Sequence, residues 1–157
     1  MNDDDFFLAR AIELAKKGSE LGEGGPFGAV IVRDGKIIAE DWNRVVVSRD
    51  PTAHAEIGAI RRACVAVDHF HLPNSTLYAS SEPCPMCLSA AYWARIERIV
   101  FANSRAEAAA IGFCDDELYC ELGRHFSARS IIMEHHPLPN SLLPLQHWAA
   151  NPTRTPY

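Results

Sequence analysis

The feature that most constrains the fold of this sequence is an Asp-Gly pair at residues 34–35. It separates two apolar runs, Gly-Ala-Val-Ile-Val over 28–32 and Lys-Ile-Ile-Ala-Glu over 36–40. An Asp-Gly pair between two such runs is typical of a tight β-hairpin, because both turn positions then adopt positive φ. The sequence therefore predicts two antiparallel strands near the N-terminus of the domain.

The rest of the chain alternates helical and strand patterns, with no repeat, low-complexity segment or linker. Helical spacing predicts four helices, over 5–17, 54–67, 84–96 and 106–112. Runs of β-branched and aromatic residues predict three further strands, over 75–81, 98–104 and 130–136. Residues 43–53 should form a loop, and the proline-rich tail 137–157 a short helix between extended segments. A hairpin followed by strand–helix alternation indicates an α/β fold, namely a three-layer α/β/α sandwich with a mixed five-stranded sheet.

Length and composition indicate one soluble domain. A chain of 157 residues with 48% apolar and 22% charged residues can bury a core without disulfides, so we expect a single domain over 1–157. The acidic start does not resemble a secretory signal, and no apolar run approaches the roughly 20 residues that cross a bilayer. We therefore expect a cytoplasmic protein with no membrane partner.

The charge balance argues against a nucleic-acid partner. Fifteen Lys and Arg residues against twenty Asp and Glu residues give a net charge of −5. Proteins that bind RNA or DNA draw most of their affinity from basic side chains on phosphates. The pairs Arg61 with Arg62, and Arg95 with Arg98, are more typical of a solvated face.

Cys84 and Cys87 form a Cys-x-x-Cys pair in the stretch Ala-Ser-Ser-Glu-Pro-Cys-Pro-Met-Cys. Five cysteines are an odd number, so a disulfide framework is not expected. The pair could be a redox dithiol at a helix N-terminus. It could be half of a structural zinc site, but the sequence has no second such pair. It could also supply two of the three protein ligands of a catalytic zinc site, which a histidine would complete.

His54 is the histidine that stands out, because Glu56 follows it at the expected start of a helix. His-x-Glu at one helix start and Pro-Cys-x-x-Cys at the next is the signature of zinc nucleobase deaminases. Two residues apart on a helix lie about 200° apart around its axis. We therefore predict that the helix begins close to His54, so that both side chains face one metal ion.

This set of residues suits hydrolytic removal of an aromatic amine. Zinc can lower the pKa of a bound water to about 7 and so supply a nucleophile. Protons must then reach a ring nitrogen and the departing amine. Glu56, which is not a ligand, is placed to carry these protons as general base and acid.

Four segments, GGPFGAVIV, NRVVVSRDPTAHAEIGAI, EPCPMC and YWAR, resemble the cytidine and deoxycytidylate deaminase superfamily over nearly the whole chain. Within it, DPTAHAE, PCPMCLSAAYWAR, AIGFCDDELY and the tail ending in tyrosine are most similar to bacterial guanine deaminases. The resemblance implies a cytidine deaminase-like fold, conversion of guanine to xanthine and ammonia, and one Zn²⁺ per subunit. It further implies His54, Cys84 and Cys87 as zinc ligands and Glu56 as the proton shuttle.

The same resemblance implies contacts to a small purine substrate. The residues that it assigns to this role are Phe27, Asn43, Ala55, Asp115 and Tyr157. Asp115 would accept hydrogen bonds from N–H groups along one edge of guanine. Because this chain has Cys114 at a position where we expect an acidic residue, Asp116 remains an alternative reader. The tail 137–157 would cross to a partner subunit in a domain-swapped homodimer.

Alternatives remain open on the sequence. Guanosine would need only open space beside the pocket. A tRNA adenosine deaminase shares the zinc motif, yet residues 130–157 contain no lysine and one arginine, Arg154. A non-catalytic zinc-binding module is a third possibility. Asn43 could simply cap a turn, while Phe27 and Trp93 would ordinarily lie in the core. Cys64, Cys114 and Cys120, which lack ligand spacing, would be small buried groups.

Overall fold

The computed structural model describes residues 3–157, in two compact units, one ending at Asp115 and the other Asp116–Tyr157. The first unit contains a four-stranded mixed sheet in the order β2-β1-β3-β4. Its strands are β1 (Gly28–Arg33), β2 (Lys36–Trp42), β3 (Ser75–Ser81) and β4 (Arg98–Asn103). β1 pairs antiparallel with β2 and β3, whereas β3 and β4 are parallel.

The predicted hairpin is confirmed. Asp34 and Gly35 have φ angles of 51° and 70°, so both turn positions are left-handed, as an Asp-Gly hairpin turn requires. β1 is buried along five of its six residues. Alternate side chains of this strand therefore serve two different cores, one on each face of the sheet.

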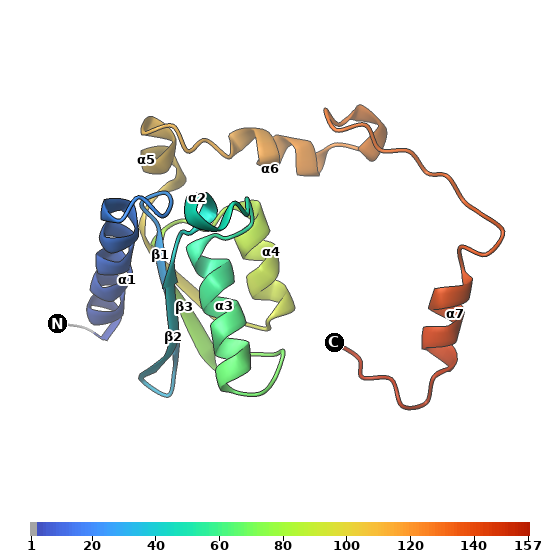
Figure 1. Ribbon diagram of the computed structural model, residues 1–157, viewed down its shortest axis with the longest axis horizontal. Coiled ribbons are helices and arrows are strands. Elements are labelled where there is room, and N and C mark those ends of the chain that lie inside the picture. The colour runs from blue at the N-terminus through green and yellow to red at the C-terminus, as the bar shows by residue number, and fades with distance from the viewer. Residues whose placement is uncertain (1–2) are drawn as a thin grey trace. The chain divides into compact units, whose positions relative to one another are not determined.

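Helices cover both faces of the sheet (Figure 1). On one face, α1 (Asp3–Glu20) packs Phe7 and Leu14 against Val30 of β1. On the other face, α3 (Ala55–Ala66) and α4 (Pro85–Trp93) pack against Ile31 and neighbouring side chains. Gly28 lets α1 approach closely, since a Cβ there would lie 2.2 Å from the Ala11 carbonyl oxygen. The three layers of the predicted sandwich are thus present.

Of two short helices in the first unit, one was not predicted and the other was. The loop predicted over 43–53 contains one helical turn, α2 (Val45–Ser48). The helix predicted over 106–112 is α5 (Arg105–Ala110), which begins with a capping box between Ser104 and Glu107.

The second unit differs from the sequence prediction in one strand and one helix. It contains α6 (Asp116–Gly123), the 3₁₀ helix η1 (Phe126–Ala128) and α7 (Leu143–Ala150). The short tail helix is confirmed by α7, whereas α6 was not predicted. The strand predicted over 130–136 is wrong, so the sheet has four strands instead of five. A strand needs a partner for its backbone N–H and C=O groups, and the second unit offers none within Asp116–Tyr157.

Some predicted environments also differ. Trp93 is 64% exposed and not a core residue, because it lies on the outer side of α4, whose neighbouring Ala91 and Ala94 are the residues buried against the core. Cys114 and Cys120 are exposed instead of buried, while Cys64 is half-buried. All five cysteines are free, as expected. Within residues 3–157 no helix has the length and apolarity that a membrane span requires. The cytoplasmic location and the single domain over 1–157 stay predictions.

Candidate metal centre and substrate site

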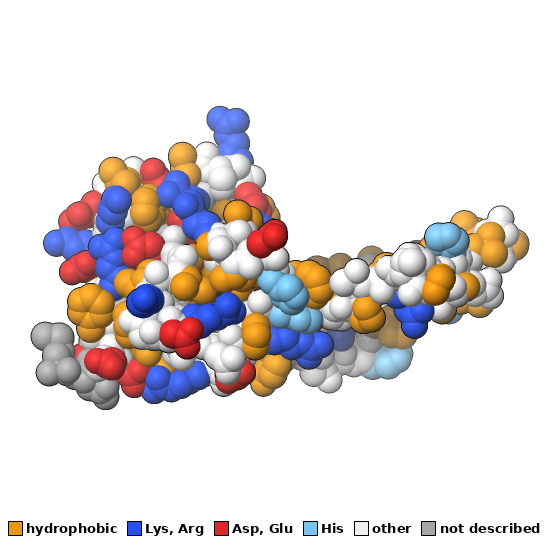
Figure 2. Space-filling view, turned by 90° about the horizontal axis from the view of Figure 1, so that it is seen from below, with side chains coloured by type: hydrophobic (Ala, Val, Ile, Leu, Met, Phe, Trp, Pro, Cys, Tyr) orange, Lys and Arg blue, Asp and Glu red, His pale blue; other side chains and the backbone are white. Residues whose placement is uncertain are grey.

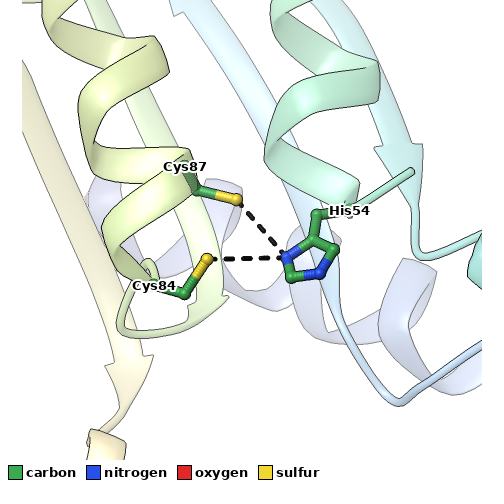
Figure 3. A group of neighbouring side chains, drawn as sticks. All are labelled: His54, Cys84 and Cys87. Carbon is green, nitrogen blue, oxygen red and sulfur yellow. Dashed lines mark hydrogen bonds between the residues drawn. The ribbon is translucent and has the colours of Figure 1, made fainter. Parts of the chain in front are cut away.

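His54, Cys84 and Cys87 bring three metal-binding atoms together at the N-terminal ends of two helices (Figure 3). The ligand atoms of the three side chains all lie within 4.8 Å of one another. The Nδ1 atom of His54 is 3.6 Å from the Sγ of Cys84 and 3.5 Å from the Sγ of Cys87. Side chains far apart in the sequence therefore converge on one point.

The local structure explains this convergence. His54 is the N-cap of α3, with extended φ and ψ of −71° and 156°, and Ala55 is the first helical residue. The predicted helix start is therefore confirmed. Two residues that are two positions apart within a helix point about 200° away from each other. Because His54 precedes the first helical residue, its side chain can point to the same side as that of Glu56.

The two cysteines use a helix start in the same way. Cys84 is the N-cap of α4 and Pro85 occupies the first turn, where a missing N–H costs nothing. Cys87 follows in the first turn and is fully buried. Both sulfurs lie near the positive end of the α4 dipole, which favours thiolates.

This donor set fits zinc. Two thiolates and one imidazole nitrogen are ligands that Zn²⁺ prefers, and three protein ligands leave a fourth tetrahedral position open.

The three groups also shift one another's pKa values through hydrogen bonds. The hydrogen bond from Cys87 lowers the pKa of Cys84 to about 4, and the same bond raises the pKa of Cys87. The hydrogen bond to Cys84 raises the pKa of His54. A divalent cation would replace these protons, because zinc binds the thiolate and the neutral imidazole.

Glu56 lies beside this cluster without belonging to it. Its side chain is buried, and its Oε2 atom accepts a hydrogen bond from Cys87 at 3.5 Å. Burial raises the pKa of this carboxyl group. A buried carboxyl next to a metal centre that is not itself a ligand is free both to accept and to donate a proton.

Asn43 directly follows β2. Its side-chain oxygen caps a turn, and its side-chain NH2 group points to a further role. Its buried Oδ1 accepts from the backbone N–H groups of Gly25 and Val45, at 3.2 and 3.1 Å. With the carbonyl oxygen used twice by the backbone, the Nδ2 group is left to bond a ligand. The turn-capping interpretation is therefore correct, and it is compatible with substrate binding.

Phe27 is half-buried and packs edge-on against Phe113, with ring centroids 4.9 Å apart. The Phe27 carbonyl accepts from the Asn43 N–H at 2.9 Å, so these two predicted substrate residues are neighbours. Phe113 was not singled out in the sequence. The only signal for it was its place in the Gly-Phe-Cys-Asp-Asp stretch, immediately before the predicted aspartates.

Ala55, Asp115 and Tyr157 have different environments. Ala55 is fully buried at the first position of α3, where its N–H has no acceptor within the helix. Asp115 forms an ion pair with Arg105, at 3.9 Å between Oδ1 and Nε. Tyr157 belongs to the second unit, where its ring contacts Trp148. The substrate roles of all three stay predictions.

Glu82 joins the loop before Cys84 to the segment that carries Asp115. Its Oε2 accepts from the Arg105 N–H at 3.0 Å, at the start of α5. Its partner could not be read from the sequence, because the two residues are 23 positions apart.

Comparisons with known proteins agree with this geometry. Residues 1–103 match the cytidine and deoxycytidylate deaminase zinc-binding region. The chain is 49% identical to guanine deaminase of Bacillus subtilis over 144 residues, which span 92% of each chain. The X-ray structure of guanine deaminase from Bacillus subtilis matches with a TM-score of 0.95 and 46% identity, over 98% of each chain. The tRNA-specific adenosine deaminase of Haemophilus influenzae is 47% identical over 118 residues, 72% of this chain and 68% of that protein. Because the domain match spans residues 1–103 and the Bacillus subtilis relative is 49% identical over 92% of each chain, this chain belongs to the cytidine and deoxycytidylate deaminase family, which has a zinc-binding region.

Proposed function

We propose that this protein hydrolyses guanine to xanthine and ammonia. The observation that carries the proposal is the likeness to a guanine deaminase over 92% of both sequences and 98% of both structures. That likeness extends through the segment after residue 103, where the family domain ends. The geometry of His54, Cys84, Cys87 and Glu56 supports the hydrolytic chemistry.

In this mechanism Glu56 moves the protons. Zinc held by His54, Cys84 and Cys87 would supply the Lewis acidity that makes water a nucleophile at neutral pH. Glu56 accepts a proton from that water and delivers it to a ring nitrogen as the new C–O bond forms. Glu56 next accepts the remaining proton from the hydroxyl that is now bonded to the ring carbon and delivers it to the exocyclic amine. The C–N bond then breaks, the carbonyl of xanthine forms and neutral ammonia leaves. Burial raises the pKa of Glu56, which suits a group that must give up each proton that it takes.

Other side chains would hold the base in place. Asn43 offers its Nδ2 group as a donor, and the Phe27 and Phe113 rings offer flat apolar surface to the purine. Asp115 would accept from two neighbouring N–H groups of guanine, a pattern that adenine and cytosine do not present. Such a carboxylate discriminates strongly, since a base without those donors would forgo two charge-assisted hydrogen bonds.

Deamination of adenosine in tRNA is the second candidate, because the Haemophilus influenzae enzyme is 47% identical over 118 residues. On the face in Figure 2, acidic side chains lie among the Lys and Arg side chains. Residues 130–157 carry Arg154 as their one basic residue apart from histidines. A tRNA substrate would require a basic surface for the phosphates, so we favour the free base.

A substrate panel tests the proposal. Purified protein with one zinc per chain is incubated with guanine, guanosine, adenine, cytosine, cytidine and a tRNA anticodon arm, and released ammonia is measured. We expect release from guanine, with xanthine as the other product. Release from guanosine alone would change the substrate to the nucleoside. Conversion of adenosine in the tRNA, without turnover of guanine, would overturn the proposal.

We further propose that the tail acts across a homodimer. No residue from Asp116 to Tyr157 is buried, and large apolar side chains such as Ile132, Leu145 and Trp148 are exposed there. A segment without a core of its own needs another surface to cover such side chains. The exposed apolar side chains of the tail 137–157, such as Leu145 and Trp148, support its exchange between two subunits.

A complementation experiment separates a swapped tail from an intramolecular one. Glu56→Ala and Tyr157→Ala chains are each expected to be impaired. If the tail crosses, a mixed dimer contains one intact site, made of Glu56 from one chain and Tyr157 from the other. Co-expression should then restore about a quarter of wild-type activity, because half of the random dimers are mixed. Absence of any restoration in verified mixed dimers would reject the swap.

A further inference from the structure

Asp41 is a buried carboxylate that bonds the residues on both sides of Asn43. Its side chain is 6% exposed. Its Oδ1 atom accepts from the backbone N–H of Trp42 at 2.9 Å and from the Nε of Arg44 at 3.0 Å. One carboxylate oxygen therefore holds the residue before Asn43 by its backbone and the residue after it by its side chain.

Arg44 extends this contact in three further directions. Its NH1 group donates to Glu23 at 3.1 Å, and its guanidinium lies 4.2 Å from the centre of the Trp42 ring. Its backbone N–H donates to the carbonyl of Ala53 at 2.9 Å, one residue before His54. The same arginine thus touches the end of β2 and the approach to the metal ligand.

The second oxygen of Asp41 reaches α3. The Nε of Arg62 donates to Oδ2 at 2.9 Å. Gly58, on the same helix, leaves the space for this carboxylate, since a Cβ there would lie 2.3 Å from Oδ2. α3 also carries Glu56 in its first turn, so Asp41 connects the turn of Asn43 with the helix of the proton shuttle.

We infer that Asp41 and Arg44 are positioning residues, which hold the Asn43 amide in register with the His54–Glu56 end of α3 for purine binding. This inference rests on the proposed function of the site. A buried carboxylate is costly unless its partners surround it. Here all its partners lie on the two segments that carry substrate and proton-transfer groups. A pair that served stability alone would have no need of both neighbours of Asn43.

Asp41→Asn tests this role, because it keeps the shape of the side chain and removes the charge that holds both guanidinium groups. We expect the KM for guanine to rise about tenfold, the size of one misplaced hydrogen bond. The turnover number should change much less, and zinc should remain at one per chain. A rise in KM at constant kcat indicates lost binding that is shared by ground state and transition state.

Glu40→Gln is the matched control. Glu40 precedes Asp41 on β2, and its carboxylate accepts two hydrogen bonds from Arg10 of α1, at 2.9 and 2.5 Å. This change removes an ion pair between the same strand and a helix on the other face. It should lower the melting temperature while leaving the KM unchanged. Equal KM changes in the two variants, or loss of zinc from Asp41→Asn, would overturn the inference.

Arg44→Lys provides a second variant if Asp41→Asn does not fold. Lysine keeps the positive charge, but it lacks the planar guanidinium, in which Nε bonds Asp41 while NH1 bonds Glu23. We expect the same rise in KM, and an unchanged KM would reject the role of Arg44. The wild-type substrate panel separates this result from the proposed function. If wild type releases ammonia from another base, guanine deamination fails, and the KM comparison on that base still decides the positioning role.

Discussion

The Oε2 atom of Glu56 lies 3.5 Å from the Sγ atom of Cys87. The buried carboxyl group of Glu56 therefore contacts one of the candidate metal ligands directly. Glu56 itself is not among the three side chains that converge. A proton shuttle needs this arrangement, because a carboxylate that bound the metal could not release and accept protons freely. Glu56 is therefore close enough to the centre to exchange protons there, but it is not one of the three ligands.

Glu56→Gln should abolish turnover and preserve the metal. The amide has nearly the same shape but cannot accept a proton, so we expect kcat to fall by about 10²- to 10⁴-fold or more. Zinc measured by atomic absorption should stay at one per chain, since the three ligands are untouched. A non-catalytic zinc module predicts the opposite, namely that function survives the change.

Removal of zinc should abolish turnover reversibly. A chelator should inactivate the protein, and added Zn²⁺ should restore activity, because the two sulfurs and the imidazole lie close enough together to hold one ion. Cys84→Ser should lose both zinc and activity. Cys64→Ala is the matched control, since Cys64 is a half-buried cysteine outside the cluster. It should keep its zinc, and zinc loss from both variants would indicate unfolding instead of a lost ligand.

Asp115→Asn should reduce selectivity for guanine. A carboxylate that accepts two N–H groups contributes about 2–4 kcal/mol through charge-assisted bonds, so kcat/KM for guanine should fall about 30- to 1000-fold. Asp116→Asn, the neighbouring change at the first position of α6, should have little effect. The reverse result would assign the purine contact to Asp116, while no effect in either variant would mean that another group reads the base.

Tyr78 should make the fold sensitive to alkaline pH. Burial, together with the hydrogen bond that its hydroxyl donates to Asp4 at 2.6 Å, raises its pKa to about 12. The folded protein therefore holds this proton more tightly than the unfolded chain, whose tyrosine titrates near 10. The resulting stabilisation is complete below about pH 10 and is lost as the pH rises towards 12. Melting temperatures between pH 9 and 11 should fall more steeply for wild type than for Tyr78→Phe, and parallel curves would contradict this.

The local features of the fold were predictable because they depend on neighbours in sequence. Positive φ at Asp34 and Gly35 follows from turn chemistry, and the start of α3 at Ala55 follows from the need to aim His54 and Glu56 together. The Cys84–Cys87 spacing likewise places two sulfurs on one helix start.

Features that depend on distant partners were not predictable. Residues 130–136 have strand propensity, but no strand in their unit pairs with them. Asp41 could not be distinguished from a surface residue, because its partner Arg62 is 21 positions away. The hydrogen bond between Glu82 and the start of α5 could not be predicted for the same reason. In each case the sequence contains the group, and only the packed structure supplies its partner.

Gly58→Ala should destabilise the protein, although helix propensity alone predicts the opposite. Alanine is favoured over glycine in a helix by about 0.8–1.0 kcal/mol. At this position a Cβ would lie 2.3 Å from the Oδ2 and 2.9 Å from the Cγ of Asp41, and that carboxylate is held by two arginines. Overpacking of this kind costs about 1–3 kcal/mol, so the clash should outweigh the propensity gain.

Denaturant unfolding measures the difference in stability between Gly58→Ala and wild type. Gly123→Ala is the control, because nothing lies within 4 Å of its Cβ. If Gly58→Ala is more stable than wild type, Asp41 moves freely and cannot hold Asn43; if it is less stable, the KM for guanine should rise as in Asp41→Asn.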